Sequence, residues 1–176
     1  PELKGTVENL LGIYPVFHSA GFSVSQNLPI WNGWCCTLVP RPEPDVILEM
    51  LRKFKPTFLP GVPTIYTGLL NNEKFRKMDL SFVTGYFAGA APLPEETLNQ
   101  LKKLHGAVIH DVYGATENTA FATVTPWKGT VKIGTVGVPI PNTDVKIVDL
   151  DTGTKELPTG EAGEICIKGP QVMQGY

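Results

Sequence analysis

Apolar strand-like segments alternate with helix-like segments through the first two-thirds of the chain, and this alternation constrains the fold most. The helical spacing is clearest in Val46, Ile47, Met50, Leu51 and Phe54, which fall on one face of a 3.6-residue period. A helix between two strands requires a crossover connection, which makes the strands parallel neighbours in one sheet. The near-continuous apolar strands fit burial of both sheet faces. The sequence therefore predicts an α/β fold, with helices on both faces of a parallel sheet.

Proline, glycine and charged residues place the boundaries of these segments. Strands are expected at residues 10–14, 37–39, 57–59, 83–88 and 107–113. Helices are expected at residues 20–31, 46–54, 64–70 and 94–104. The last helix is the best marked, because acidic residues stand in its first turn, basic residues in its last turn and Gly106 just beyond.

After about Thr125 the pattern changes to polar–apolar alternation with no helical period. Residues 144–149 and 164–168 alternate in this way, and a turn signal at residues 151–154 lies between them. These segments predict antiparallel strands of a small β unit that is incomplete within this chain. We therefore divide the chain into an α/β subdomain and an incomplete β-barrel-like subdomain, residues 1–127 and residues 128–176.

Composition and charge exclude several classes of protein. Of the 176 residues, 42% are hydrophobic and 18% are charged, which is typical of a globular chain rather than a disordered one. A net charge of −2 provides no basic surface for nucleic acid, and no apolar run approaches the roughly 20 residues that span a bilayer. Cys35, Cys36 and Cys166 form no CxxC pair, so we expect buried, reduced thiols in a cytoplasmic protein. None of these features specifies an oligomeric state.

One heptad carries most of the chemistry: residues 111–117 read Asp-Val-Tyr-Gly-Ala-Thr-Glu and directly follow the apolar run 107–109. A strand end followed by a small-residue turn is where parallel α/β sheets bind ligands. Tyr113 offers a ring face for a base, Thr116 a hydroxyl for a phosphate oxygen, and Glu117 a hard oxygen ligand for Mg²⁺. These residue types suit a nucleotide, although a Thr-Glu pair can also cap a following helix.

Four segments follow one another in a set order: Pro-Val-Phe-His-Ser-Ala-Gly at residues 15–21, Phe-Ala-Gly-Ala-Ala-Pro-Leu at 87–93, Tyr-Gly-Ala-Thr-Glu at 113–117, and Gly-Glu-Ile-Cys-Ile-Lys-Gly at 163–169 with Gly-Tyr at 175–176. Together they resemble the motifs of the AMP-forming acyl-CoA synthetases, the adenylate-forming, AMP-binding group that includes firefly luciferase and the adenylation domains of peptide synthetases. The resemblance covers essentially the whole chain. Fatty-acyl-CoA ligases look most similar, judged by residues 55–64 and by the apolar character of the first half.

The resemblance implies a ligase that joins a fatty acid to CoA and uses ATP and Mg²⁺. The carboxylate attacks the α-phosphorus of ATP and releases pyrophosphate, and the CoA thiolate then displaces AMP from the acyl-adenylate. Thr116 and Glu117 would be the catalytic residues, with Thr116 donating to the α-phosphate and Glu117 binding the metal. The α/β subdomain would hold both the acyl site and the adenine site.

The remaining nucleotide contacts are also implied by the resemblance. Tyr113 would stack on adenine, Asp111 would lie near its exocyclic amine, and Gly114 would allow close backbone approach. The other implied nucleotide-binding residues are Val112, Ala115, Gly89, Ala90, Ala91 and Pro92, the last four as a flat wall under the adenine. Ala90 departs from the family pattern, because it stands where the family has a second glycine. An ordinary strand-to-helix turn is the alternative interpretation of that wall.

His18, Phe17 and Phe22 are the three candidates for the acyl side. The resemblance implies this place for His18 of the first segment. Phe17, Phe22 and the region from Trp31 to Trp34 could line an apolar tunnel, although an apolar residue is more often part of a core than of a pocket. His18 would act as a gate or orienter of the carboxylate rather than as a general base. A lone histidine beside phenylalanines is also a common packed core residue, and that alternative stays open.

The family's phosphate-binding Gly/Ser/Thr-rich loop would lie before Pro1, and its ribose-binding aspartate and lid lysine would lie after Tyr176. The chain also begins without a start signal and stops in a loop-like pattern. We therefore expect a central fragment that is inactive by itself, because each missing hydrogen-bonding group removes about 1 kcal/mol of binding or more.

Other functions remain open. An aryl-CoA ligase or an amino-acid adenylation domain would share the fold, although an amino-acid substrate favours a pocket aspartate for its ammonium group, and no obvious candidate is present. A non-catalytic α/β binding module is a further alternative, but it has little need of the Thr116–Glu117 pair. The acyl-chain length is not determined by the sequence.

Overall fold

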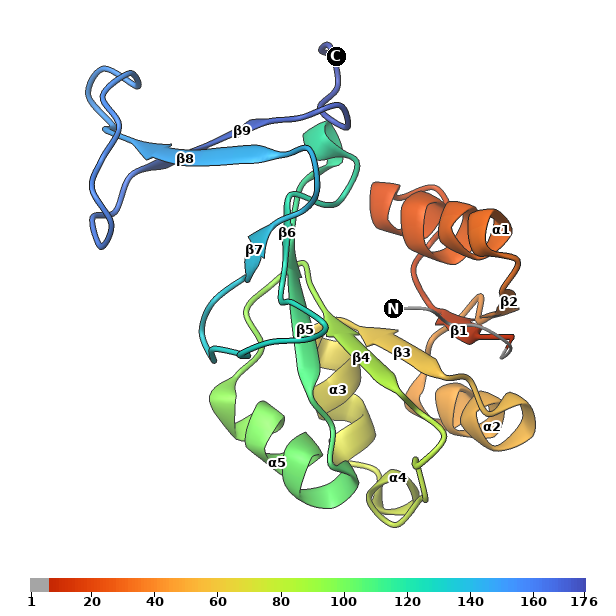
Figure 1. The fold of residues 1–176 in the computed structure, drawn as a ribbon. Helices are drawn as coiled ribbons and strands as arrows, with labels where there is room; N and C mark the ends of the chain where they lie inside the picture. Colours follow the sequence, from red (N-terminus) through yellow and green to blue (C-terminus); the bar gives the residue numbers. More distant parts are fainter. Residues whose placement is uncertain (1–6) are drawn as a thin grey trace.

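The computed structural model describes residues 7–176 and is built around one seven-stranded sheet (Figure 1). Its strand order is β2-β1-β3-β4-β5-β6-β7. Neighbours from β2 to β5 are parallel, whereas β5–β6 and β6–β7 are antiparallel. The predicted α/β sheet is confirmed. The prediction of a wholly parallel sheet is corrected, because β6 and β7 at one end of it are antiparallel. The strands are β1 (Asn9–Gly12), β2 (Cys35–Leu38), β3 (Phe58–Gly61), β4 (Gly85–Ala88), β5 (Ile109–Tyr113), β6 (Thr123–Val124) and β7 (Val138–Pro139).

Helices cover both faces of this sheet, as predicted, but unequally (Figure 1). The segment formed by the π-helix η1 and α1 lies over one face near β1 and β2, and α2 to α5 lie on the other side. The helical segments are η1 (Gly21–Asn27), α1 (Leu28–Asn32), α2 (Pro44–Phe54), α3 (Pro63–Leu70), α4 (Glu73–Arg76), α5 (Glu95–His105) and the 3₁₀ turn η2 (Thr116–Asn118). One sheet face is therefore only partly covered by helices.

The helix expected at residues 20–31 is present, but its first part is a π-helix. Gly21 begins this part in close contact with the preceding loop, where an added Cβ would lie 1.8 Å from the Pro15 carbonyl oxygen. Pro29 stands in the first turn of α1. It has no backbone N–H and cannot donate a hydrogen bond that would continue the π-helix. The α-helix then ends at Gly33, which takes the left-handed conformation with φ 65°.

The main hydrophobic core lies between the sheet and α2 to α5. The apolar stripe predicted for α2 is confirmed at Ile47, Leu48 and Leu51, which are buried. Phe54 belongs to the same stripe but is 44% exposed, because the helix ends there and the following Lys55 turns left-handed. The other large core side chains include Leu11, Leu59, Tyr66, Leu69, Phe75, Leu101 and Ile109.

A second, two-stranded antiparallel sheet consists of β8 (Asp144–Val148) and β9 (Glu164–Lys168). The predicted pair of antiparallel strands is therefore confirmed. In Figure 1 this sheet lies beyond the end of the large sheet where β5 leads into η2. β7 lies in the second half of the chain yet pairs with β6 in the large sheet. The subdomain boundary between residues 127 and 128 stays a prediction.

The cysteines are not all buried as expected. Cys35 is exposed, because it begins an edge strand with a neighbour on one side only, while Cys36 and Cys166 are half-buried. All three thiols are free. Within residues 7–176, no helix is both long and apolar enough to cross a membrane.

Candidate active site

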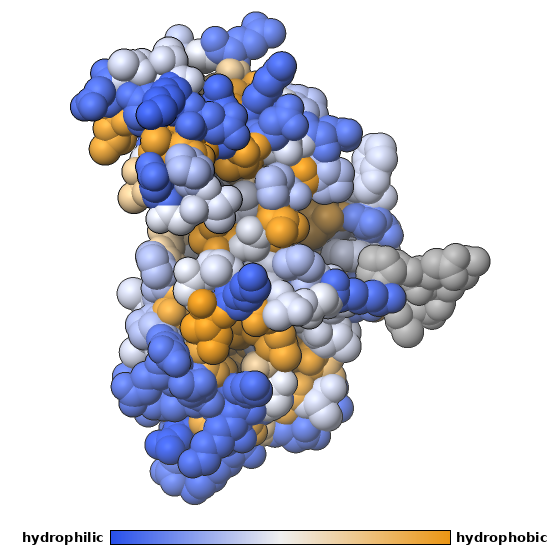
Figure 2. Space-filling model, turned by 60° about the vertical axis from the view of Figure 1, so that its left-hand side comes forward, coloured by the Kyte–Doolittle hydropathy of each residue, from blue (hydrophilic) through white to orange (hydrophobic). Residues whose placement is uncertain are grey.

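A cavity of about 1210 Å³ lies between the η1–α1 segment and the sheet face beneath it. Most of its lining is apolar, and Figure 2 shows apolar surface gathered between the hydrophilic upper and lower ends of the molecule. The polar or titratable lining side chains include His18, Ser19, Ser23, Thr116 and Glu117. A cavity that is mainly apolar, with a few polar groups, is typical of a small-molecule site.

The cavity runs along the strand direction, with a polar end and an aromatic end. His18 follows the carboxyl end of β1, and Thr116 and Glu117 follow that of β5. Carboxyl ends of parallel strands lie at the same edge of a sheet, so these side chains share one end of the cavity. Trp34 precedes β2 and Phe58 begins β3, which places both toward the opposite, amino edge.

The loop after β5 presents Thr116 and Glu117 to the cavity. Asn118 is buried, and its Oδ1 accepts a hydrogen bond from the Ala115 N–H at 2.8 Å. The backbone of this loop leaves no room for a side chain at Gly114, because a Cβ there would lie 2.0 Å from the Ala120 carbonyl oxygen. The loop therefore doubles back tightly on itself, and Thr116 and Glu117 remain exposed.

Glu117 is the candidate ligand for Mg²⁺. Its Oε1 accepts a hydrogen bond from the Tyr176 hydroxyl at 2.8 Å. Hydrogen bonds from its own backbone N–H and from Tyr176 lower the pKa of the Glu117 carboxyl, so it stays ionised near neutral pH. Across the described residues, no cluster of three or more His, Cys, Asp or Glu side chains could hold a metal alone. A single carboxylate fits Mg²⁺ that takes its other ligands from water and substrate phosphates.

The expected adenine wall after β4 only partly lines the cavity. Gly89 and Ala90 belong to the lining, whereas Ala91 and Pro92 are exposed outside it. Ala90 has φ 68°, in the left-handed region that favours glycine. An added Cβ on Gly89 would lie 3.2 Å from the Val112 carbonyl oxygen, which fits the close approach of the ends of β4 and β5. The role of this segment in adenine binding stays a prediction.

Asp111 and Tyr113 do not line the cavity, whereas Val112 between them does. The reason is the two-residue period of a strand, which directs alternate side chains of β5 to opposite faces. Burial raises the pKa of Asp111, and nearby His110 acts in the opposite direction. A nucleotide that contacts Asp111 or Tyr113 would have to reach the other face of β5, so these two assignments also stay predictions.

Of the three acyl-side candidates, only His18 lines the cavity. It is exposed rather than packed in the core, and its Nδ1 accepts a hydrogen bond from the Ala20 N–H at 3.1 Å. A neutral ring held in this way carries its proton on Nε2. Phe17 is 93% exposed and Phe22 46% exposed, and neither belongs to the lining.

An aromatic wall formed by Trp34, Phe58 and Phe87 lies at the inner part of the cavity. Phe58 lies outside the sequence motifs, and Phe87 opens the second motif but had no predicted role. Trp34 stacks on Phe58 with ring centroids 5.2 Å apart and an interplanar angle of 11°. The ring centroids of Phe58 and Phe87 are 5.7 Å apart. Gly85 leaves space for this packing, because a Cβ there would lie 2.5 Å from the Phe58 ring. A glycine inside a strand is the sequence signal that could have indicated such a close approach.

Comparison with known proteins identifies the family to which the chain belongs. The profile of the AMP-binding enzyme family matches residues 3–176. The chain belongs to the AMP-binding enzymes. Its seven-stranded sheet with helices on both faces and its small second sheet are the fold of the acyl-CoA synthetases in this family.

Three similar proteins illustrate the range of AMP-binding enzymes around this chain. It is 38% identical over 175 residues to a long-chain-fatty-acid–CoA ligase of Bacillus subtilis, covering 99% of this chain and 31% of the ligase. It is 39% identical over 171 residues to a probable 4-coumarate–CoA ligase of Dictyostelium discoideum, covering 96% of this chain and 31% of that protein. ATP-bound MatB from Rhodopseudomonas palustris matches with a TM-score of 0.88 and 32% identity, over 96% of this chain and 33% of MatB. The chain thus spans about a third of each relative's length.

Proposed function

We propose that this chain supplies part of the active site of an ATP-dependent, AMP-forming carboxylic acid–CoA ligase whose substrate is a fatty acid. The reaction would begin with attack of the acid's carboxylate oxygen on the α-phosphorus of ATP, with pyrophosphate leaving. The CoA thiolate would then attack the acyl carbon and displace AMP. The observation that carries this proposal is one cavity that joins an apolar, aromatic end to a polar end bearing Thr116 and Glu117.

The residues at the polar end would divide the work of the first step. Thr116 would donate its hydroxyl hydrogen to an α-phosphate oxygen, and Glu117 would hold Mg²⁺ through its ionised carboxylate. When bound, the metal would neutralise charge on the phosphate oxygens. His18, with its proton on Nε2, would donate to the acid's carboxylate and orient it. Gly89 and Ala90 would offer a small-residue surface against the adenine.

The lining favours an acid without an ammonium group. Glu117 is the one carboxylate among the described lining residues, and we assign it to the metal. An amino acid would need a second acidic partner deeper in the cavity. Straight apolar chains need only the apolar surface that the inner lining supplies.

An aryl acid is the second candidate, and one observation favours it. The Trp34–Phe58 pair is stacked almost flat, so a planar ring could continue the stack. The likeness to the coumarate–CoA ligase supports this candidate at an identity similar to that of the fatty-acid ligase. We place the fatty acid first because most of the lining is aliphatic or small. The free thiols agree with a reducing, cytoplasmic location, which is part of the proposal.

The test uses the complete protein that contains this chain, with ATP, Mg²⁺, CoA and a panel of fatty, aryl and amino acids. Pyrophosphate release and CoA ester formation with straight-chain acids are expected to exceed those with the other classes. Glu117→Gln should lower adenylate formation by about a hundredfold or more, since a transition-state charge contact is lost, while fatty-acid binding stays nearly unchanged.

Glu161→Gln is the matched control, because Glu161 is an exposed glutamate in the turn before β9. It should leave pyrophosphate release unchanged. Wild-type pyrophosphate release by Glu117→Gln at limiting Mg²⁺ would contradict the metal role. Absence of release with every acid would instead favour a non-catalytic binding module.

A further inference from the structure

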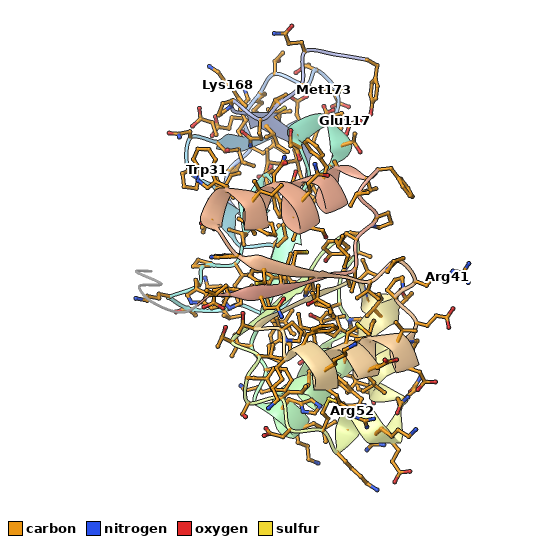
Figure 3. The ribbon with its side chains drawn as sticks, turned by 90° about the vertical axis from the view of Figure 1, so that its right-hand side faces the viewer. Trp31, Arg41, Arg52, Glu117, Lys168 and Met173 are labelled. Carbon is orange, nitrogen blue, oxygen red and sulfur yellow. The ribbon has the colours of Figure 1, made fainter. Side chains whose placement is uncertain are left out.

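The chain after β9 folds back onto the loop that carries Thr116 and Glu117. The Met173 N–H donates to the Glu117 carbonyl oxygen at 2.8 Å, and the Thr119 hydroxyl donates to the Gln171 carbonyl oxygen at 2.8 Å. Figure 3 shows Met173 next to Glu117 at one end of the η1–α1 segment. The residues in these contacts are more than 50 positions apart in the sequence.

The side chain of Gln171 is central to this contact. Its Nε2 donates to the Phe121 carbonyl oxygen at 3.2 Å and to the Thr143 hydroxyl at 2.8 Å. Gln171 therefore joins the end of the 115–121 loop, which carries Thr116 and Glu117, to the segment that leads into β8. Gly169 leaves room for the amide, because an added Cβ would lie 2.3 Å from the Gln171 Oε1.

The loop needs such support because its backbone is strained. Thr119 has φ 57° and Ala120 has φ 77°, and both are non-glycine residues in the left-handed region. Such conformations persist when surrounding contacts hold them in place. On its other side, the Ser23 hydroxyl of η1 donates to the Thr119 carbonyl oxygen at 3.2 Å. The loop is thus held between η1 and the chain after β9.

We infer that Gln171 is a positioning residue, which holds the 115–121 loop so that Thr116 and Glu117 face the nucleotide. The inference rests on the proposed function of those two residues. Gln171 lies outside the described cavity lining, so it acts through the loop and not by contact with substrate. Loss of its two donated hydrogen bonds should therefore weaken the use of MgATP and leave acid binding almost unchanged.

The test compares Gln171→Glu and Gln171→Ala in the complete protein. Glutamate has nearly the same shape but cannot donate from its ionised carboxylate, so it removes the bond to Phe121 without opening a void. Each variant is measured for its KM for MgATP, its dissociation constant for a straight-chain acid, and amide hydrogen exchange of residues 115–121. We expect the KM for MgATP to rise about tenfold, acid binding to change less than twofold, and exchange of the loop to accelerate.

Gln174 provides the matched control. It is an exposed glutamine three positions further on, and among the described residues no hydrogen bond involves its side chain. Gln174→Glu should leave all three measurements unchanged.

Unchanged loop exchange and KM in Gln171→Glu would overturn the inference, as would equal weakening of acid and nucleotide use, which indicates general loss of structure. If Gln171→Ala fails to fold, the isosteric glutamate variant decides the question. Failure of the proposed function would be seen separately, as absence of pyrophosphate release by the wild-type protein. The exchange measurement would then still show whether Gln171 holds the loop.

Discussion

At the scale of single residues, Ala90 shows how a departure from the family pattern is accommodated. Its φ of 68° lies in the region where a Cβ crowds the backbone. This costs an L-residue roughly 1–2 kcal/mol. The family pattern has glycine at this position, and the conformation shows why. Ala90 keeps the conformation expected of a glycine and bears the strain.

We therefore expect Ala90→Gly to stabilise the protein. The relief of about 1–2 kcal/mol is partly offset by the greater backbone entropy of glycine in the unfolded chain, so the net gain should be about 0.5–1 kcal/mol. Urea denaturation measures it. Ala91→Gly is the control: its φ is not positive, so glycine should destabilise there. A loss of stability in Ala90→Gly would show that the backbone is not strained at this residue.

His18 also yields a residue-scale prediction. If the proton on Nε2 orients the acid, a side chain with a donor near that position should retain more activity than one with an acceptor near Nδ1. Glutamine resembles the first arrangement and asparagine the second. We expect His18→Gln to retain at least about tenfold more kcat/KM for the acid than His18→Asn, since one hydrogen bond to a charged group is worth roughly 1.5 kcal/mol or more. Equal activity of the two variants would show that the distal donor has no role.

At the scale of whole elements, the regularity of a segment decides how well the sequence predicts it. α2 and α5 are long and amphipathic, and their positions are confirmed to within a residue or two. β6 and β7 contain two residues each, too few for any periodic pattern, and they exist because β5 offers an edge to pair with. The π-helical form of η1 was likewise not predicted; there Gly21 lies in close contact with the backbone of Pro15, in the loop that leads into the helix.

The element-scale prediction concerns the aromatic end of the cavity. Trp34 lines the cavity and stacks on the first residue of β3, so its indole occupies space that a longer acyl chain could enter. We expect Trp34→Ala to shift the preference of the complete protein toward longer acids. Each additional buried methylene should raise kcat/KM about fourfold, from roughly 0.8 kcal/mol of transfer free energy. The measurement is kcat/KM for saturated acids from butyrate to palmitate.

Trp127→Ala serves as the control for that experiment. Trp127 contacts the same Phe58 ring, with centroids 5.9 Å apart, but lies outside the described lining. Its removal weakens the aromatic cluster without opening the cavity, so the chain-length profile should not move. The same shift in both variants would show that loosened packing, rather than the volume freed at Trp34, sets the preference.

At the scale of the whole molecule, the two sheets meet at the 115–121 loop, which carries the proposed catalytic residues. The large sheet supplies this loop from β5, and the chain after β9 holds it through Gln171, Met173 and Tyr176. The proposed site therefore depends on both parts of the chain. The relatives are about three times as long as this chain, and we expect residues outside it to complete the site.

We accordingly expect this chain alone to be inactive. With ATP, Mg²⁺ and a fatty acid, it should release no pyrophosphate above the protein-free background, while the complete protein does. Circular dichroism and the cooperative loss of its signal on heating would establish that the isolated chain is folded. Pyrophosphate release by the chain, removed by Glu117→Gln, would contradict the expectation and show that these residues suffice for adenylation.

The sequence by itself determined the order of the main strands and helices from β1 to β5, the motifs that identify the AMP-binding enzymes, and the residue types at the end of β5. These features are local, since helical periods, strand alternation and turn residues act over a few neighbours. The tertiary structure alone decided which of those residues share a cavity. It brought His18 together with Thr116 and Glu117, and it left Tyr113 and Phe17 outside. It also joined Gln171 to the 115–121 loop, because contacts between distant segments arise from packing and leave no periodic trace in the sequence.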